Sequence, residues 1–527
     1  MIVYVCLCSF KTAERLFFNR TIKENFSDFF DILYIGTETH MKVISIDIGA
    51  TSGRVMVVEA NNSHISYREV NRFDNRIYEE DNTLYWDFSL LIGNIKEGIR
   101  MALSNEDDIE SIGIDTWAVD YGVIDKEGSL IKDPLCYRDT HTFEKQKEVL
   151  ARLPYKTIYS KVGIQNLHFN TIYQLFKDDR LKEGNRILLI PDLISYFLTG
   201  SIRMEETNAS TTSLYDFRNK RMDPELLKAL DIPSDIFPTL IFPGEEYGQL
   251  KEEYYPKGYS GKKVRVLAVC THDTASAVLG TNGEGKFAYL SSGTWSLLGT
   301  ELKERILSEE SRKADFTNEI GFDSTVRYLK NTMGMFLINE VRNDFRKKGT
   351  DVKVSDIRKL VDESKDIDSY IDTNDPVFET PGDMICKIDK YLEKTHQTEP
   401  EDKGQYLRLI YQSMALSYRK LVETLEHLTK HKVEKLIIVG GGNQAVVLNQ
   451  YTANSLNREV KTGPIEATVI GNAVCQFIHH GVFKNTIEAR KAISESTESK
   501  YYLPKDQELW NRKYERFLTI INGGNNK

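Results

Sequence analysis

A β-hairpin with a turn of small residues occurs once in each half of this 527-residue chain, and it constrains the fold more than any other feature. In the first half, the β-branched run KVISIDIG at residues 42–49 is followed, after a Gly-containing turn, by RVMVVEA. In the second half, GKFAYLSSGTWSLLGTEL at residues 285–302 has the same order of strand, turn and strand. Such spacing predicts antiparallel strand pairs. The recurrence favours two related halves.

Helical patterns alternate with the strands, which is typical of an α/β fold. Residues 87–103 carry apolar side chains at helical spacing behind Asp87, a plausible cap, and residues 406–429 read as a long amphipathic helix. A chain of this length exceeds what one core usually serves. We therefore expect two domains. The predicted segments of the chain are a leader at 1–40, a first domain at 41–282, a second domain at 283–505 and a tail at 506–527.

Composition narrows the class of protein. The formal net charge is −9, which argues against a nucleic-acid-binding surface. No apolar run approaches the roughly 20 residues of a membrane span. The six cysteines show neither a disulfide framework nor a zinc spacing, so we expect a reducing compartment, the cytoplasm.

The first turn, DIGATSGR at residues 47–54, combines glycines with hydroxyl side chains. Gly49 and Gly53 would let the backbone approach a ligand, and a turn of exposed N–H groups is a natural phosphate cradle. Asp47, at the end of its strand, could hold a hydrated Mg²⁺ ion. The alternative is a plain hairpin turn. The motif lacks both the Walker A and the dinucleotide-binding patterns.

Two glycine-containing turns in the second half extend this pattern. Gly293 and Thr294 could touch a second phosphate, while we expect Trp295 to serve packing. The run IVGGGNQAVVLNQ places three glycines, 440–442, between a strand and a helix, where a nucleotide could lie against the backbone. A tight strand–helix connection is the alternative, but one glycine would suffice for that.

The segment VLAVCTHDTASAVLG, residues 266–280, places Asp273 where a strand passes into a helix. Asp273 could simply cap the helix. Beside phosphate turns, a carboxylate could instead accept the proton of a hydroxyl group that attacks a γ-phosphate. His272 could be a structural histidine or could bind a sugar hydroxyl. The small residues that follow would let another segment come close.

The segment GIDTWAVDYGVID, residues 113–125, offers the flat face of Trp117 and two carboxylates, Asp115 and Asp120, as acceptors for hydroxyl groups. A hairpin in the core would explain most of it without a ligand. Asp120, flanked by apolar residues, fits that alternative least.

In this order, the motifs resemble the actin–hexokinase–chaperone ATPase superfamily, and within it the FGGY carbohydrate kinases. The resemblance extends from Met41 to about Tyr502. It is carried by GIDTWAVDYG, CTHDTASAV, LSSGTWSLLG, LKNTMGMFL and IVGGGNQAVVLNQ, with VGIQNLHFNTIYQL and PDLISYFLTG in support. It implies an α/β fold of two actin-like (ribonuclease H-like) ATPase domains that flank a catalytic cleft, the first binding sugar and the second nucleotide.

The resemblance also implies roles for individual residues. Asp273 would be the catalytic base, and Asp47 would hold Mg²⁺ through water. The residues expected to bind ATP are Ala50, Thr51, Ser52, Gly53, Arg54, Thr294, Asn339 and Gly441. The residues expected to bind the sugar are Ala118 through its backbone, His272, Asp273, Thr274 and Asn331. Two positions depart from the family pattern, since Ala118 replaces a frequent Gly and Asn339 replaces an expected Gln.

The reaction implied is transfer of the γ-phosphate of ATP to the 1-hydroxyl group of a ketose. The segments THDTASAV and GTWSLLG favour L-rhamnulose as the ketose. The alternatives are a kinase for another ketose, L-fuculose or D-xylulose, or a non-kinase ATPase of the superfamily. We expect the sugar and ATP as partners, without nucleic acid or membrane, in a monomer or small homo-oligomer.

Overall fold

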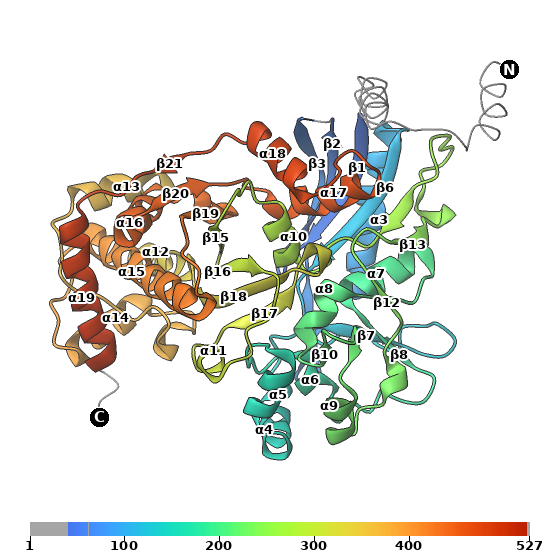
Figure 1. Ribbon diagram of the computed structural model, residues 1–527, viewed down its shortest axis with the longest axis horizontal. Helices are drawn as coiled ribbons and strands as arrows, with labels where there is room; N and C mark the ends of the chain where they lie inside the picture. The colour runs from blue at the N-terminus through green and yellow to red at the C-terminus, as the bar shows by residue number, and fades with distance from the viewer. Residues whose placement is uncertain (1–39, 62, 524–527) are drawn as a thin grey trace, which may run out of the picture. The chain divides into compact units, whose positions relative to one another are not determined.

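The computed structural model describes residues 40–61 and 63–523. Almost all of the predicted leader (1–40) lies outside the described residues, as do residues 524–527. Two large mixed β-sheets organise the described part of the chain (Figure 1). No helix among the residues described is both long and apolar enough to span a bilayer.

The first sheet has the strand order β13–β14–β6–β1–β2–β3. Strands β1, β2 and β3 form an antiparallel meander, whereas β1, β6 and β14 run parallel. Its strands are β1 (Met41–Ile48), β2 (Ser52–Ala60), β3 (Ile65–Asp74), β6 (Ile109–Thr116), β13 (Glu246–Gln249) and β14 (Arg265–Leu267).

The second sheet has the order β17–β18–β16–β15–β19–β20–β21. Strands β15, β16 and β18 form an antiparallel meander, and β15, β19 and β20 run parallel. Its strands are β15 (Phe287–Ser292), β16 (Trp295–Leu302), β17 (Thr317–Ile320), β18 (Val326–Met333), β19 (Lys435–Val439), β20 (Glu459–Thr462) and β21 (Tyr501–Tyr502). Apart from the edge strands β13, β17 and β21, the two sheets share one strand order and one set of directions. This confirms that the repeated hairpin marks two similar halves.

Short strand pairs and helices complete the fold. The paired strands are β4 (Ile77–Glu80) with β5 (Thr83–Trp86), β7 (Tyr121–Ile124) with β8 (Arg186–Leu189), β9 (Met204–Glu205) with β12 (Leu240–Ile241), and β10 (Tyr215–Asp216) with β11 (Arg221–Met222). The helices up to the second sheet are α3 (Phe88–Asn105), α4 (Thr142–Arg152), α5 (Tyr155–Val162), α6 (Thr171–Leu175), α7 (Ile190–Thr199), α8 (Glu206–Ala209), α9 (Pro224–Ala229) and α10 (Asp273–Leu279). The later helices are α11 (Glu309–Lys313), α12 (Phe336–Lys347), α13 (Val354–Glu363), α14 (Met384–Lys394), α15 (Lys403–Thr429), α16 (Val446–Leu456), α17 (Ala467–His479), α18 (Thr486–Ser496) and α19 (Gln507–Gly523).

The two helices predicted from local pattern are confirmed. The side chain of Asp87 accepts a hydrogen bond from the backbone N–H of Leu90 at 3.0 Å and so caps α3. Leu91, Ile95 and Ile99, one helical turn apart, are all buried on the face toward the first sheet. The long helix α15 covers the predicted segment and buries side chains along its whole length.

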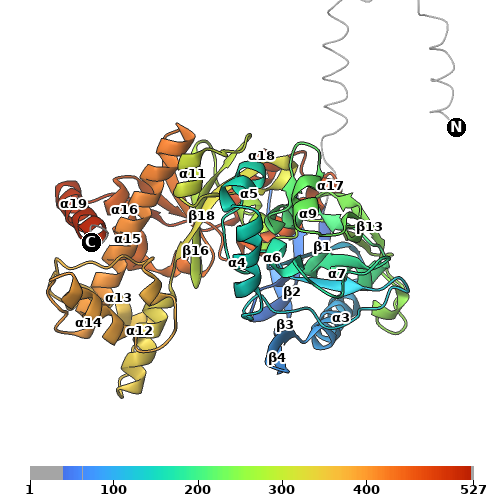
Figure 2. The same ribbon diagram turned by 90° about the horizontal axis from the view of Figure 1, so that it is seen from below.

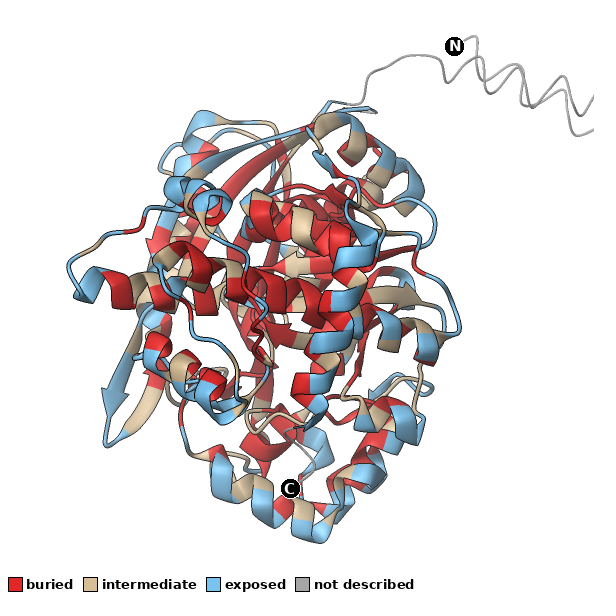
Figure 3. Ribbon diagram, turned by 90° about the vertical axis from the view of Figure 1, so that its left-hand side faces the viewer, coloured by how far each residue is buried: buried red, intermediate tan, exposed pale blue. Residues whose placement is uncertain are grey.

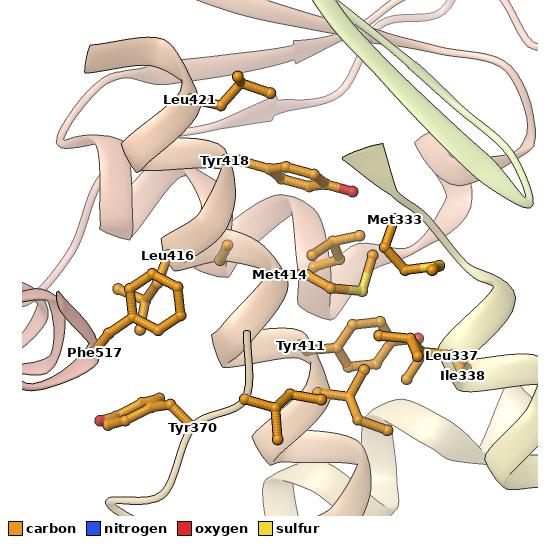
Figure 4. Close-up of a cluster of buried hydrophobic side chains, with 14 of the residues drawn as sticks. Met333, Leu337, Ile338, Tyr370, Tyr411, Met414, Leu416, Tyr418, Leu421 and Phe517 are labelled. Atoms are coloured by element: carbon orange, nitrogen blue, oxygen red, sulfur yellow. The ribbon is translucent and has the colours of Figure 1, made fainter. Parts of the chain in front are cut away.

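Helix α15 lies beside α13 and α16 (Figure 2). Its buried side chains belong to a large hydrophobic cluster of the second half of the chain. The helices around it are buried on their inner sides and exposed on their outer sides (Figure 3). Figure 4 shows part of this hydrophobic cluster. The labelled side chains, all buried, are Met333, Leu337, Ile338, Tyr370, Tyr411, Met414, Leu416, Tyr418, Leu421 and Phe517.

Phe517 belongs to α19, which corrects the prediction that residues 506–527 form a tail. Trp510, Tyr514, Phe517 and Ile521 of this helix are buried in the same cluster. Burial of these apolar side chains stabilises the helix against the second half. The amphipathic pattern was present in the sequence, but it lies beyond the end of the resembling segment.

Helices α17 and α18, which follow residue 283 in the chain, pack against the first sheet. They lie beside strands β1 to β3 (Figure 1) and share a hydrophobic cluster with Val43 and Met56 of the first sheet. Polar contacts add to this, because the side-chain amide of Gln476 donates to the carbonyl oxygen of Ile44 at 3.0 Å. A segment from the second half is therefore part of the first core.

Glycines bring α17 close to α10. A Cβ atom added to Gly471 would lie 1.8 Å from the carbonyl oxygen of Ser276, and one added to Gly280 would lie 2.0 Å from that of Ala467. The prediction that small residues after Asp273 admit another segment is thus confirmed, and α17 is that segment.

Candidate active site

The predicted site residues of the first half lie at the carboxyl ends of its parallel strands. Asp47 of β1 is directly opposite Asp115 of β6 in the strand register. The next residue, Thr116, pairs in parallel with His272, just before α10. Ligands of open α/β sheets bind at such edges. Asp47, Asp115 and Asp273 thus share one edge of the first sheet.

The first turn is held from within. The backbone N–H of Gly49 donates to the carbonyl oxygen of Ser52 at 2.9 Å. Asn75, the residue after β3, fixes the turn, since its backbone N–H donates to the carbonyl oxygen of Thr51 and its side-chain amide to that of Gly49, both at 3.0 Å. Thr51 itself is exposed at the tip.

Gly53 is a glycine for a reason that the sequence did not reveal. A Cβ atom there would lie 2.3 Å from the ring of Phe73. The space beside this backbone is filled by a buried aromatic ring, so packing accounts for Gly53. Gly49, in contrast, would meet only a carbonyl oxygen at 3.7 Å.

Arg54 links three parts of the site. It is the cross-strand partner of Asp47 and forms ion pairs with the carboxylates of Asp47 and of Glu466, the residue before α17. The guanidinium group, predicted to meet ATP phosphates, is held by these two carboxylates. Arg54 therefore joins the turn of the first half to the helix from the second half.

Asp115, considered from sequence only as an acceptor for hydroxyl groups, has no exposed surface. One of its oxygens accepts a hydrogen bond from the side-chain amide of Asn472 at 2.6 Å, and the other, Oδ1, has no partner. Burial and then the charge of Asp47 raise the pKa of Asp115 well above its usual value. An unpartnered buried carboxylate oxygen beside a second carboxylate suits a bound cation.

Asp273 is the first residue of α10, and its side chain is 29% exposed. Burial raises the pKa of Asp273 to about 6; neighbouring His272 opposes this effect and the charge of Asp47 adds to it. A carboxylate with this pKa is ionised near neutral pH and can still accept a proton. His272 Nε2 lies 3.5 Å from its Oδ1 atom.

The backbone around Ala118 forms a strained turn. Val119 has a positive φ of 70°, which is rare for a β-branched residue, and the N–H of Asp120 donates to the carbonyl oxygen of Ala118 at 3.0 Å. Strain of this kind persists only where the surroundings impose it, and it is concentrated at functional sites. The predicted sugar-binding position Ala118 is thus on a backbone of defined shape.

The carboxylate of Asp120, the residue after Val119, accepts several hydrogen bonds. It is buried, and its donors are Trp86 Nε1 at 2.7 Å, Trp117 Nε1 at 3.0 Å, Gln174 Nε2 at 2.9 Å and the backbone N–H of Tyr137 at 3.1 Å. Three of these donors bind Oδ2, and Gln174 alone binds Oδ1. Acceptance from a ligand hydroxyl by this buried carboxylate stays a prediction. Burial, opposed by these donors, raises the pKa of Asp120 to about 6.

Asn331 joins the two halves at the predicted sugar site. It lies on β18, and its side-chain amide donates to Gln165 Oε1 of the first half at 2.9 Å. Gln165 in turn donates to Asp315 at 2.6 Å. Asn339, one of the residues predicted to bind ATP, is exposed on α12, and Arg342 donates to it at 3.4 Å. This helix begins beside the second turn, since the backbone N–H of Phe336 donates to the carbonyl oxygen of Thr294 at 3.2 Å.

The glycine-rich turn of the second half packs against the end of β15. A Cβ atom on Gly442 would lie 2.0 Å from Ser292 Oγ, and Gly440 has a φ of 78°. Both positions require glycine, whereas Gly441 is exposed and its added Cβ would meet nothing. The glycine run is therefore adjacent to the second turn, Gly293 and Thr294, which directly follows Ser292.

Trp295 does not serve the packing role expected for it. It is 50% exposed, at the start of β16. The exposed face of this ring lies directly after the second turn.

Sequence reasoning missed two charged residues, Glu319 and Arg327, which contact His272 and Thr274 from the second sheet. No local pattern signals them, because their partners lie about 50 residues away in the chain. Across residues 40–61 and 63–523, no three His, Cys, Asp or Glu side chains are grouped so as to hold a metal ion by themselves.

Comparisons with known proteins place this geometry in a family. The family models of the FGGY carbohydrate kinases match residues 42–280 with the N-terminal domain and residues 288–480 with the C-terminal domain. A rhamnulokinase of Ligilactobacillus salivarius is 39% identical over 91% of this chain and 99% of its own. A rhamnulokinase of Bacillus subtilis is 38% identical over 88% and 95%.

Solved structures agree in fold. A ligand-bound xylulose kinase of Lactobacillus acidophilus has a TM-score of 0.75 at 15% identity, covering 92% of this chain and 98% of that one. A glycerol kinase of Plasmodium falciparum with ADP has a TM-score of 0.74 at 15% identity, with the same coverage. The chain, a two-domain α/β protein with a repeated sheet, belongs to the FGGY family of carbohydrate kinases.

Proposed function

We propose that this protein transfers the γ-phosphate of ATP to the 1-hydroxyl group of L-rhamnulose, giving L-rhamnulose 1-phosphate and ADP. For the substrate, support comes from relatives named rhamnulokinase that are 35–39% identical over about 90% of the chain. For the chemistry, the observation that carries the proposal is Asp273, a half-buried carboxylate with a pKa of about 6 at the sheet edge beside the first turn.

In this mechanism Asp273 accepts the proton of the sugar 1-hydroxyl group as that oxygen attacks the γ-phosphate. Phosphoryl transfer depends mainly on positioning and charge stabilisation, so one carboxylate base suffices. The side chains of His272, Thr274 and Asn331 and the backbone of Ala118 orient the sugar. The strained turn at Val119 supports this assignment, since it presents Ala118 in one defined conformation.

The residues proposed to bind ATP line the turns of both halves. Gly441, exposed and free of side-chain neighbours, is suited to contact with the nucleotide, and Thr294 to contact with a phosphate. The remaining assignments are Ala50, Thr51, Ser52, Gly53, Arg54 and Asn339. Asn339 is exposed on α12, and Arg54 has the least support because it is paired with two carboxylates.

The residues present fit a Mg²⁺ ion. Asp47 lies beside Asp115, whose Oδ1 has no partner, and Mg²⁺ prefers oxygen ligands while keeping several waters. Asp47 would hold it through water, with Asp115 next to it. When bound, the ion would neutralise charge on the phosphates.

We also propose a sugar-binding domain at residues 41–282 and a nucleotide-binding domain at 283–505, with α17 and α18 contributing to the first core. A cytoplasmic location and a monomer or small homo-oligomer, with no nucleic-acid or membrane partner, complete the proposal.

The test is coupled ADP release with Mg²⁺ and ATP over a panel of L-rhamnulose, L-fuculose, D-xylulose, D-ribulose and glycerol. A strong preference for L-rhamnulose would support the proposal. Activity on another ketose alone would retain the mechanism and overturn the substrate. ATP hydrolysis without any dependence on sugar would overturn both.

A further inference from the structure

A buried ion pair of the second sheet faces the turn that carries Asp273, and the proposed mechanism does not use it. Glu319 of β17 and Arg327 of β18 are directly opposite each other in the strand register, with Arg327 Nη2 3.1 Å from Glu319 Oε2. The side chain of Arg327 has no exposed surface, and that of Glu319 is 10% exposed. Because apolar residues often serve stability equally well, a buried pair raises the question of another role.

Arg327 uses all three of its nitrogen atoms. Nε donates to the carbonyl oxygen of Ile320 at 3.0 Å, which fixes the guanidinium plane against its own sheet. Nη1 donates to Thr274 Oγ1 at 2.7 Å, and Nη2 lies 3.1 Å from His272 Nδ1. A side chain of the second half thus contacts the residue before Asp273 and the residue after it.

The contact with His272 determines where that ring carries its proton. Arginine can only donate hydrogen bonds, so a bond from Arg327 Nη2 makes His272 Nδ1 the acceptor, and a neutral ring then carries its proton on Nε2. The hydroxyl of Thr274 lies 3.2 Å from Nδ1 and 3.1 Å from Nε2, so it is compatible with either tautomer. Nε2 is the atom 3.5 Å from Asp273 Oδ1. Glu319 Oε2 lies 3.4 Å from Nδ1 and would favour the opposite tautomer if Arg327 were absent.

The same turn is anchored from the other side by the first half. The buried carboxylate of Glu205 accepts hydrogen bonds from the backbone N–H of Thr271 at 3.2 Å and from its hydroxyl at 2.5 Å. The turn is therefore held at Thr271 by its own half and at His272 and Thr274 by Arg327.

We propose that Arg327, held by Glu319, is a positioning residue for phosphoryl transfer: it keeps the proton of His272 on Nε2 and orients the side chains on both sides of Asp273. This rests on the proposed function, in which Asp273 is the base and His272 and Thr274 bind the sugar. It adds that the second half of the chain sets the geometry of the base.

The first experiment reads the tautomer directly and needs no activity. Protein labelled with ¹⁵N-histidine is compared by NMR in the wild type and Arg327→Met, with the His272 signals assigned by their loss in His272→Gln. We expect Nε2–H in the wild type and a shift to Nδ1–H in Arg327→Met. Arg490→Met is the matched control, since Arg490 of α18 pairs with Glu301 of β16 at 2.6 Å, and its loss should leave His272 unchanged. An unchanged tautomer in Arg327→Met overturns the proposal.

The second experiment covers the case in which Arg327→Met fails to fold because Glu319 is left unpaired. The double variant Arg327→Met/Glu319→Met replaces the pair with apolar side chains, a change that buried pairs often tolerate. We expect kcat to fall about 10- to 100-fold from misplacement of the reacting groups, with the KM for ATP unchanged and the melting temperature retained. A folded double variant with kcat within twofold of the wild type overturns the proposal.

Asp273→Asn, assayed in parallel, separates the two hypotheses. Full turnover in that variant would refute the proposed function, whereas the NMR result would still decide whether Arg327 sets the tautomer of His272.

Discussion

Asp47 and Asp115 lie directly opposite each other on the parallel strands β1 and β6, at the edge where both strands end. Two carboxylates side by side repel each other, and after burial this charge is the second cause of the raised pKa of Asp115. A divalent cation near them would relieve the repulsion. Arg54 partly does so from the side of Asp47.

If Mg²⁺ is held by water through Asp47, Asp47→Asn should raise the Mg²⁺ concentration that gives half-maximal turnover by about 10- to 100-fold, the usual effect of losing an outer-shell partner. EDTA should abolish turnover of the wild type. Asp108→Asn is the control. Asp108 directly precedes β6, at the end of the strand away from Asp115, so its loss should leave the Mg²⁺ requirement unchanged. An unaltered requirement in Asp47→Asn would refute this site.

The pH dependence of kcat/KM should report Asp273. Because its pKa is about 6 and the ionised form is the base, kcat/KM should fall about tenfold for each unit of pH below 6. Asp273→Asn should lose about 10²- to 10⁴-fold in kcat, the usual range for a general base, and the remaining rate should lack this acid limb. A stopped assay over pH 5–8 tests both, and an acid limb retained in the variant would argue against Asp273 as the base.

Asp273 should also make the folded protein less stable as pH rises. A folded-state pKa raised from 3.8 to about 6 means that the group's contribution to stability is full below about pH 4 and is lost as pH rises through about 6. Relative to Asp273→Asn, the wild type should therefore lose about 1–2 kcal/mol of unfolding free energy between pH 5 and 7.5 in denaturant titrations.

Asp178→Asn is the control for this measurement. Burial would raise the pKa of Asp178, but hydrogen bonds and charge from Arg180 outweigh it and lower the pKa. Asp178 is thus ionised in both states above pH 5, and its difference from the wild type should be constant. A constant difference for Asp273→Asn as well would contradict the raised pKa.

The crossing of α10 and α17 should not tolerate a methyl group. In Gly471→Ala the new Cβ would lie 1.8 Å from a backbone carbonyl oxygen, which cannot rotate away, so we expect a loss of at least about 1–3 kcal/mol in unfolding free energy. Gly93→Ala is the matched control inside α3, where nothing lies within 4 Å of the added Cβ. It should stabilise by up to about 1 kcal/mol. Equal melting temperatures for the two variants would contradict the close crossing.

Tryptophan fluorescence should report ligand binding beside the second turn. Of the four tryptophans in the chain, Trp295 is 50% exposed, and Trp86, Trp117 and Trp510 are at most 6% exposed. Acrylamide should therefore quench mainly Trp295, and saturating Mg²⁺, ATP and ketose should reduce the quenching by covering the ring. Trp295→Phe should lack the ligand-sensitive component. Quenching that ligands leave unaltered would place them away from this face.

Several features of the molecule could be predicted because their cause lies within a few residues. The two hairpins follow from runs of strand-forming residues joined by small turns, and α3 begins where Asp87 caps it. The position of Asp273 at the start of a helix could also be predicted, since an apolar run ends just before it.

The remaining site depends on contacts between distant segments. The ring of Phe73 leaves no room for a side chain at Gly53, and Ser292 leaves none at Gly442. Donors from four segments bind the buried carboxylate of Asp120. None of these partners is visible in a local pattern, because a side chain's neighbours across a sheet depend on strand order and register.

Periodicity, caps and glycines act over short stretches of chain, so the two similar α/β halves, their turns and the carboxylate of Asp273 can be predicted from local pattern. That α17 completes the first core, that Asp47 faces Asp115, and that Arg327 contacts His272 depends on how distant segments pack together. These relationships arise from burying apolar surface and pairing charges between segments far apart in the chain, which no stretch of sequence specifies alone.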